Sequence, residues 1–179
     1  MSMVLAVLCL LLSTDSAQAK VANVSLEQLV RDSGFIGMVK VQSLSTNESG
    51  KVVAVGKILA TWKGDETKTV RFQANKEFGD CDLTTGLEGE TIILFSKETA
   101  FAEVMTISYA GRGRLPVQSH QGMWYAGLPV GLDLPEAMGK ATVKAEKGTG
   151  NLVKVSELKT EVMSMRGRIP VPRKEMQGK

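Results

Sequence analysis

The sequence predicts a mainly β fold: a small, strongly curved antiparallel barrel, preceded by a short helix and followed by an extension that ends in a helix. Several short segments are rich in β-branched residues or alternate apolar with polar residues, and glycines interrupt or separate them. Only two stretches space their apolar residues as a helix does. The chain has 179 residues, of which 43% are hydrophobic and 23% charged, which is typical of one globular domain with appendages rather than of a disordered chain.

The first helix is predicted by a capping box. Ser25 and Gln28 have the spacing of an N-cap residue and of the N3 residue that returns its hydrogen bond. Three apolar residues supply one face of the helix: Leu26, Leu29 and Val30. We therefore expect a helix of two turns that ends near Ser33-Gly34.

The strands are predicted from apolar, β-branched or alternating segments. These are residues 35–44, 51–62, 67–74, 91–95, 104–110 and 123–130, with 141–146 as a weaker candidate. Gly37 and Gly56 lie inside the first two segments, where we expect a bulge and a bend. Residues 111–117 contain two glycines and a proline, and we expect them to break the strand pattern.

The last helix is predicted to begin at Ser156-Glu157, because three apolar residues follow at the spacing i, i+4 and i+7: Leu158, Val162 and Met165. After it, residues 166–179 carry five basic residues and one acidic residue, whereas residues 20–165 carry 17 of each. Pro170 and Pro172 favour an extended backbone there. We expect residues 166–179 to form a flexible basic tail that is solvated or contacts an anionic surface.

The N-terminal residues 1–19 have the pattern of a signal peptide. Met3–Leu12 is an apolar stretch, and Ala17-Gln18-Ala19 places small residues where a signal peptidase needs them, although no Lys or Arg precedes the apolar stretch. We expect cleavage before Lys20 and export to the periplasm or the medium, with a buried N-terminal helix as the alternative. No apolar run in the chain is long enough to span a membrane.

Cleavage would leave one cysteine, Cys81, because Cys9 lies in the signal peptide. No intrachain disulfide could then form. We expect Cys81 to be a free thiol that is buried or inert, and the alternatives are a reactive thiol or a bond to another chain. The mature chain would consist of a barrel over 20–117, an extension packed on it over 118–165, and the tail.

The sequence offers little catalytic chemistry. The chain contains one histidine, His120, and no recognisable hydrolase, nucleotide-binding or zinc-protease motif. The Asp80-Cys81-Asp82 triplet would point alternate side chains to opposite faces of an extended strand, so it does not form a metal cage by itself. We therefore expect no enzyme, no metal and no cofactor, with a hydrolase that uses His120 and a nearby serine as a remaining alternative.

One cluster is a candidate binding surface. Arg112 and Arg114 could present guanidinium groups to a carboxylate, a phosphate or a glycan, and Trp124 and Tyr125 follow closely in the sequence. Nucleic acid is not an expected partner, because residues 20–165 have no net charge and several of the nine aromatic residues are needed for the core.

Three segments resemble the netrin-like module of the tissue-inhibitor-of-metalloproteinase type, including its small exported bacterial members. They read VRDSGFIGMVKV, GKILATWKGDETKTVRFQA and GDCDLTTGLEGETIILF, within residues 25–110. The family motifs fall on Ile36–Val41, Trp62-Lys63-Gly64, Cys81 and Gly89–Phe95. The resemblance implies a five-stranded antiparallel barrel of the OB type.

The inhibitors of this family chelate the zinc of a protease through an N-terminal cysteine, whereas the expected mature chain begins at Lys20. We therefore expect an exported, non-enzymatic interaction module that binds a protein or an anionic envelope component. Protease inhibition of the netrin-like type, through the loops of the barrel, is the alternative.

Overall fold

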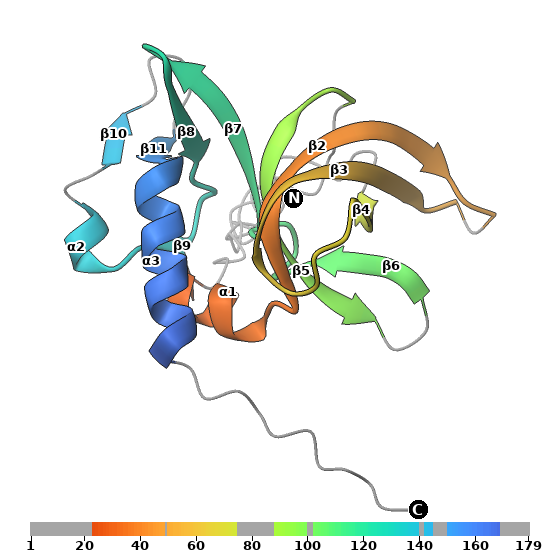
Figure 1. Cartoon of the computed structure of the whole chain (residues 1–179), viewed down its shortest axis with the longest axis horizontal. Helices are drawn as coiled ribbons and strands as arrows, with labels where there is room; N and C mark the ends of the chain where they lie inside the picture. The colour runs from red at the N-terminus through yellow and green to blue at the C-terminus, as the bar shows by residue number, and fades with distance from the viewer. Residues whose placement is uncertain are drawn as a thin grey trace, which may run out of the picture.

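The computed structural model describes residues 23–48, 50–74, 88–99, 102–139, 142–144 and 150–168. This part of the chain is mainly β (Figure 1). Cys81, the expected signal peptide and residues 169–179 lie outside the described residues. Within the described part, no helix is long and apolar enough to cross a bilayer.

The described residues form three helices and eleven strands. The helices are α1 (Leu26–Asp32), α2 (Glu136–Gly139) and α3 (Val155–Arg168). The strands are β1 (Val24–Ser25), β2 (Phe35–Thr46), β3 (Val52–Lys63), β4 (Thr69–Ala74), β5 (Thr91–Thr99), β6 (Ala102–Ile107), β7 (Arg114–His120), β8 (Met123–Gly127), β9 (Leu132–Asp133), β10 (Thr142–Lys144) and β11 (Asn151–Lys154).

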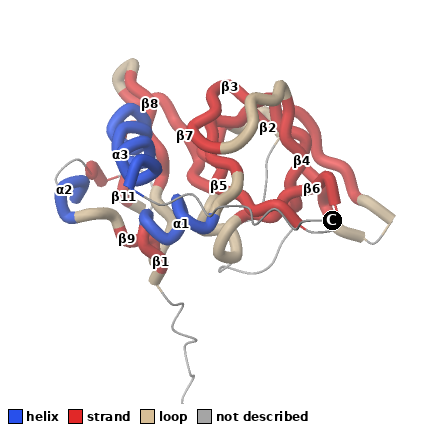
Figure 2. Tube along the Cα trace, turned by 60° about the horizontal axis from the view of Figure 1, so that its bottom comes forward, coloured by secondary structure: helices blue, strands red, loops and turns tan. Residues whose placement is uncertain are grey.

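Most strands belong to one nine-stranded sheet, in the order β10-β11-β8-β7-β5-β2-β3-β4-β6. All neighbours in this order are antiparallel except β4 and β6, which are parallel. Strand β6 also pairs with β5, so it contacts both β4 and β5. Strands β1 and β9 form a separate parallel pair. The helices gather at one end of the molecule, and β2, β3, β4 and β6 lie at the other (Figures 1 and 2).

The predicted capping box is confirmed at α1. The Ser25 Oγ accepts a hydrogen bond from the Gln28 backbone N–H at 3.1 Å, and the Gln28 Oε1 accepts one from the Ser25 backbone N–H at 2.8 Å. The three predicted apolar residues are fully buried: Leu26, Leu29 and Val30. Helix α1 ends at Asp32, one residue before the predicted end.

The bulge predicted at Gly37 is confirmed, and at Gly56, where a bend was predicted, the structure shows a close approach of the two strands. The pairing of β2 with β3 shifts register between Ile36 and Gly37, as in a bulge. A Cβ atom at Gly37 would lie 2.6 Å from the Ala60 carbonyl oxygen, and one at Gly56 would lie 2.2 Å from a Val39 methyl carbon. Glycine at these two positions allows β2 and β3 to approach each other closely.

The prediction that residues 111–117 break the pattern is wrong for its second half, because β7 begins at Arg114 and continues through Pro116 to His120. The strand pairs with β5 on one side and β8 on the other, and Leu115 is fully buried. These tertiary contacts override the local signal of proline and glycine. The break lies earlier, where Tyr109 and Ala110 have φ values of +53° and +48°, so the predicted strand 104–110 ends at Ile107.

The described residues contain two hydrophobic cores, on opposite faces of β2 and β3. We name them the strand core and the helix core. The strand core comprises Phe35, Val39, Val41, Val52, Ala54, Val70, Phe72, Ala74, Ile92, Leu94 and Ile107. The helix core comprises Val24, Leu26, Leu29, Val30, Ile36, Trp62, Ile93, Phe95, Leu115, Ala126, Met138, Val153, Leu158, Val162 and Met165.

Helix α3 confirms the predicted apolar face, since Leu158, Val162 and Met165 are buried in the helix core. It ends later than predicted. Arg166 and Arg168, the first two cations of the predicted tail, belong to the last turn of the helix. Cations are favourable at a helix C-terminus, and the Arg168 guanidinium also pairs with the Glu161 carboxylate at 3.1 Å.

Candidate functional site

Arg114, one of the predicted binding residues, forms a nearly buried ion pair. Its Nε donates to the Glu90 Oε1 at 3.2 Å, and its Nη2 donates to the Glu90 Oε2. The side chains of Arg114 and Glu90 are only 10% and 14% exposed. This bidentate ion pair joins the start of β7 to the residue before β5, so it stabilises the pairing of these two strands.

Arg112 lies in the turn between β6 and β7 and is half-buried. Its Nη1 donates to the Tyr109 carbonyl oxygen at 3.5 Å, and its buried Nε has no hydrogen-bond partner within the described structure. A Cβ atom at Gly131 would lie 3.3 Å from this Nε, so the guanidinium packs against the glycine backbone just before β9.

Trp124 and Tyr125 are neighbours on β8 and therefore point to opposite faces of the sheet. Tyr125 is 5% exposed, and its ring meets the His120 ring edge to face, with 6.0 Å between centroids. Trp124 is 56% exposed. Of the four predicted residues, the structure therefore leaves one well-exposed side chain, and it does not bring the four into one surface.

The exposed tryptophan belongs to the tip of the hairpin formed by β7 and β8. His120 pairs with Met123, which leaves Gln121 and Gly122 as the turn, with φ values of +50° and +76°. Two residues with positive φ are the mark of a type I′ turn, which matches the twist of paired strands. Met123, 43% exposed, precedes Trp124 on β8 and points to the opposite face of the hairpin, and the tip that both residues flank projects from the sheet (Figures 1 and 2).

His120 does not lie in a catalytic arrangement with its neighbour in sequence. Ser119 precedes it on β7, so the two side chains point to opposite faces. Among the described residues, no group of three or more His, Cys, Asp or Glu side chains could hold a metal ion.

A polar cluster that the sequence analysis missed links α1 to the turn after β6. The Tyr109 hydroxyl donates to the Asp32 Oδ2, and the Lys97 Nζ lies 4.9 Å from the centre of the Tyr109 ring. This hydrogen bond, assisted by Arg31, holds the pKa of Asp32 below its usual value. The same bond, together with burial, raises the pKa of Tyr109. No local pattern could reveal a contact between residues so far apart in the sequence.

Lys63, within the predicted Trp-Lys-Gly turn, has a structural role. Its Nζ donates to the carbonyl oxygens of Val30 and Arg31 at 2.7 and 3.2 Å, which satisfies the C-terminal end of α1. Burial, and then the nearby Arg166 charge, lower the pKa of Lys63. Arg166 in turn donates to the Trp62 carbonyl oxygen and fastens α3 to β3.

A shallow pocket of about 350 Å³ lies between α2 and α3. Its lining includes two carboxylates, of Glu157 and Glu161. Glu157 lies 3.8 Å from the Lys154 ammonium group, and Glu161 lies 3.1 Å from the Arg168 guanidinium. Both carboxylates therefore have a cation nearby, whereas the other Glu157 oxygen, Oε2, is buried without a hydrogen-bond partner within the described structure.

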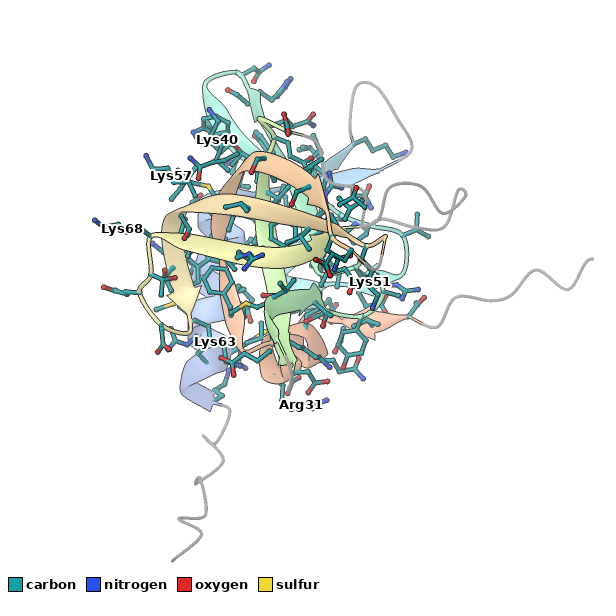
Figure 3. The ribbon with its side chains drawn as sticks, turned by 90° about the vertical axis from the view of Figure 1, so that its right-hand side faces the viewer. Arg31, Lys40, Lys51, Lys57, Lys63 and Lys68 are labelled. Atoms are coloured by element: carbon teal, nitrogen blue, oxygen red, sulfur yellow. The ribbon has the colours of Figure 1, made fainter. Side chains whose placement is uncertain are left out.

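The outer surface of β2, β3 and β4 is the other feature that the sequence analysis missed (Figure 3). These strands contain four basic residues, Lys40, Lys57, Lys63 and Arg71, and no acidic residue. The excess of basic residues on these strands could have been read from the sequence, but the equal numbers of basic and acidic residues over 20–165 concealed it.

Comparisons with protein-family models and with curated proteins found no match to this chain. The functional proposal therefore depends on the fold and on the surfaces described above.

Proposed function

We propose that the protein is an exported, non-enzymatic binding module built on a small barrel of the OB type, as in netrin-like proteins. The strand pairings support the barrel, because they run from β2 to β3, β4, β6 and β5 and then return to β2. A five-stranded sheet with this circular order and one parallel pair has the connectivity of such a barrel.

The observation that carries the binding role is the exposed tip of the β7–β8 hairpin. Met123 and Trp124 are 43% and 56% exposed there. Tryptophan is enriched among the residues that dominate protein–protein binding, because it buries a large apolar surface and still offers an N–H donor. The proposed partner at this tip is a protein of the envelope.

The proposed compartment agrees with the position of the first elements. Cleavage before Lys20 would leave β1 and α1 in the mature chain, since β1 begins at Val24. Strand β1 is held by its pairing with β9, and the Asn23 amide donates to the Asp133 carboxylate at 3.2 Å. The N-terminus of the mature chain would therefore lie a few residues before β1, which is held in place by these contacts.

The non-enzymatic role is supported by what the polar side chains do. Arg114 and Glu90 join two strands, and Asp32 and Tyr109 join a helix to a turn. Each of these pairs uses its charge or hydroxyl to hold the fold.

Capture from an envelope extract tests the binding role. The mature chain, residues 20–179, is immobilised as wild type, as the double variant Met123→Ala/Trp124→Ala, and as the control Val130→Ala, which changes another exposed apolar residue. We expect the double variant to lose about tenfold or more of the captured protein, and the control to lose less than about twofold. Equal capture by all three proteins would refute the role of the tip.

Incubation of the mature chain with a panel of zinc and serine proteases tests the alternative of protease inhibition. We expect no loss of protease activity, because the proposed N-terminal residue, Lys20, has no thiol to place on a zinc ion. Stoichiometric inhibition of any of these proteases would favour the alternative.

A further inference from the structure

Three exposed lysines lie near one another: one on β2, one on β3 and one just before β4. Lys40 on β2 stands directly opposite Lys57 on β3, and Lys57 stands opposite Thr69, the residue after Lys68. The Lys68 carbonyl oxygen accepts a hydrogen bond from the Ile58 N–H at 3.0 Å, which fixes Lys68 beside β3. Figure 3 shows Lys40, Lys57 and Lys68 projecting on the same side of the ribbon, one after another. We call them the lysine row.

The lysine row carries unbalanced charge. Within the described structure, none of its three ammonium groups forms an ion pair. Like charges directly opposite each other on neighbouring strands repel and destabilise the sheet. A sheet that keeps Lys40 opposite Lys57, with no acidic residue on β2, β3 or β4, concentrates positive potential at these two lysines. Asp65 and Glu66, in the turn before Lys68, lie outside these strands.

We propose that the lysine row binds an extended acidic polysaccharide that crosses the strands. Neighbouring strands are about 4.8 Å apart, so the row spans about 10 Å and can meet successive carboxylates of one polymer. Gln42 and Thr69, both exposed near the row, offer an amide and a hydroxyl to sugar hydroxyl groups. The site lies on different residues from the hairpin tip, and this proposal goes beyond the protein contact proposed there.

Single-stranded nucleic acid fits the row less well. Binding of unpaired bases depends on exposed aromatic rings next to the cations. The three aromatic residues of β2, β3 and β4 are all buried, with Phe35 at 3%, Trp62 at 2% and Phe72 at 0% exposure.

A lipid surface also fits less well. Interfacial binding combines cations with several apolar side chains that enter the bilayer. Leu59, 44% exposed, is the one large apolar side chain on these three strands that is strongly exposed in the described structure. A row of charges along one line suits a linear polymer better than a plane of headgroups.

The test measures binding of the mature chain to polygalacturonate, a linear polymer with one carboxylate per sugar. Neutral dextran, single-stranded oligothymidine and phosphatidylglycerol vesicles are measured in parallel. The variant Lys40→Ala/Lys57→Ala/Lys68→Ala is compared with Lys51→Ala/Lys144→Ala/Lys159→Ala, which removes the same net charge from exposed lysines elsewhere. Circular dichroism checks that both variants keep the fold.

We expect wild type to bind polygalacturonate and not dextran, with an affinity that falls as salt rises. The row variant should lose about tenfold or more in affinity, and the control variant less than about threefold. Equal losses in the two variants, or no binding by wild type, would overturn the proposal. Tighter binding of oligothymidine or of vesicles through the same three lysines would overturn the assignment to a polysaccharide.

The single variant Lys57→Glu separates binding from stability. It replaces the repulsion with Lys40 by an attraction, so the folded protein should not be weakened. We nevertheless expect its affinity for polygalacturonate to fall about tenfold or more. Unchanged affinity would contradict the proposal, because a reversed charge in the middle of the row must repel the polymer.

Discussion

The strand core and the helix core are built from different parts of the chain. Strands β2 to β6 supply the strand core, and all its members come from residues 35–107. The helix core joins β1 and α1, near residue 24, to α3, which ends at residue 168. The first core draws on one continuous part of the chain, although it also needs the pairings of β2 with β5 and of β4 with β6. The second core depends on bringing the two ends of the described chain together.

This difference predicts that the two cores respond differently to damage. A cavity in the strand core weakens the sheet on which both cores rest. A cavity in the helix core weakens mainly the packing of α1 and α3 against the sheet, since the buried residues of these two helices belong to the helix core alone. The following predictions test this difference, from the largest expected effect to the smallest.

Phe72→Ala should have the largest effect, because Phe72 is fully buried in the strand core. We expect a loss of about 3–5 kcal/mol in the free energy of unfolding, measured by urea denaturation. Thr69→Ala, on the same strand but exposed, is the matched control and should change stability by less than about 0.5 kcal/mol. A Phe72 variant as stable as this control would show that the strand core is not close-packed.

Leu158→Ala removes a fully buried side chain of α3 from the helix core. We expect a loss of about 2–4 kcal/mol. Hydrogen exchange should accelerate in α3 and β11 more than in β2 and β3, because local opening follows the weakened contacts. Uniform acceleration over all these elements would contradict the distinction between the two cores.

Tyr109→Phe removes the hydroxyl that holds Asp32 at the end of α1. We expect a loss of about 1 kcal/mol near neutral pH, because the lost hydrogen bond has a charged acceptor that is partly exposed. The pKa of Asp32 is lower in the folded protein than its ordinary value of 3.8. The stabilisation is therefore present above that value and disappears as pH falls through the folded-state pKa.

Urea denaturation of wild type and Tyr109→Phe between pH 2 and pH 7 measures this effect. The difference in stability between the two proteins should be largest at the upper end of the range and shrink in acid. A difference that does not vary with pH would mean that the bond to the Asp32 carboxylate is not its source.

Lys40→Thr should have the smallest effect, and of the opposite sign. Removing the repulsion with Lys57 should stabilise the sheet by about 0.2–0.5 kcal/mol at low salt, and less at high salt. Lys51→Thr is the control, because Lys51 lies in the turn before β3 and forms no ion pair within the described structure. Destabilisation of the Lys40 variant would mean that its aliphatic stem contributes more than its charge.

The same difference between the cores explains how far the sequence could predict the fold. The strands of the strand core have clear local signals: β2 and β3 are long and β-branched, and Gly37 and Gly56 mark their irregularities. The cap and apolar face of α1 were also predictable, because the residues involved are close in sequence. The helix core was predicted less well, since β7 contains Pro116 and is held by neighbours on both sides.

The candidate site was harder to predict for the same reason. Proximity in sequence suggested that four residues share a surface: Arg112, Arg114, Trp124 and Tyr125. In the structure, the two aromatic side chains point to opposite faces of β8, and the Arg114 guanidinium forms an ion pair with the Glu90 carboxylate. The lysine row depends on the register of β2 against β3, which no local pattern specifies.

Site-specific photocrosslinking most directly tests the central claim, that the protein works by binding a partner. A photoreactive phenylalanine derivative replaces either Trp124 or Val130 in a protein of residues 20–179, which is then irradiated in an envelope extract. We predict a discrete adduct from position 124 that is absent from position 130 and is competed by wild type but not by Trp124→Ala. Identical adducts from both positions, or an adduct that Trp124→Ala competes equally well, would contradict the claim.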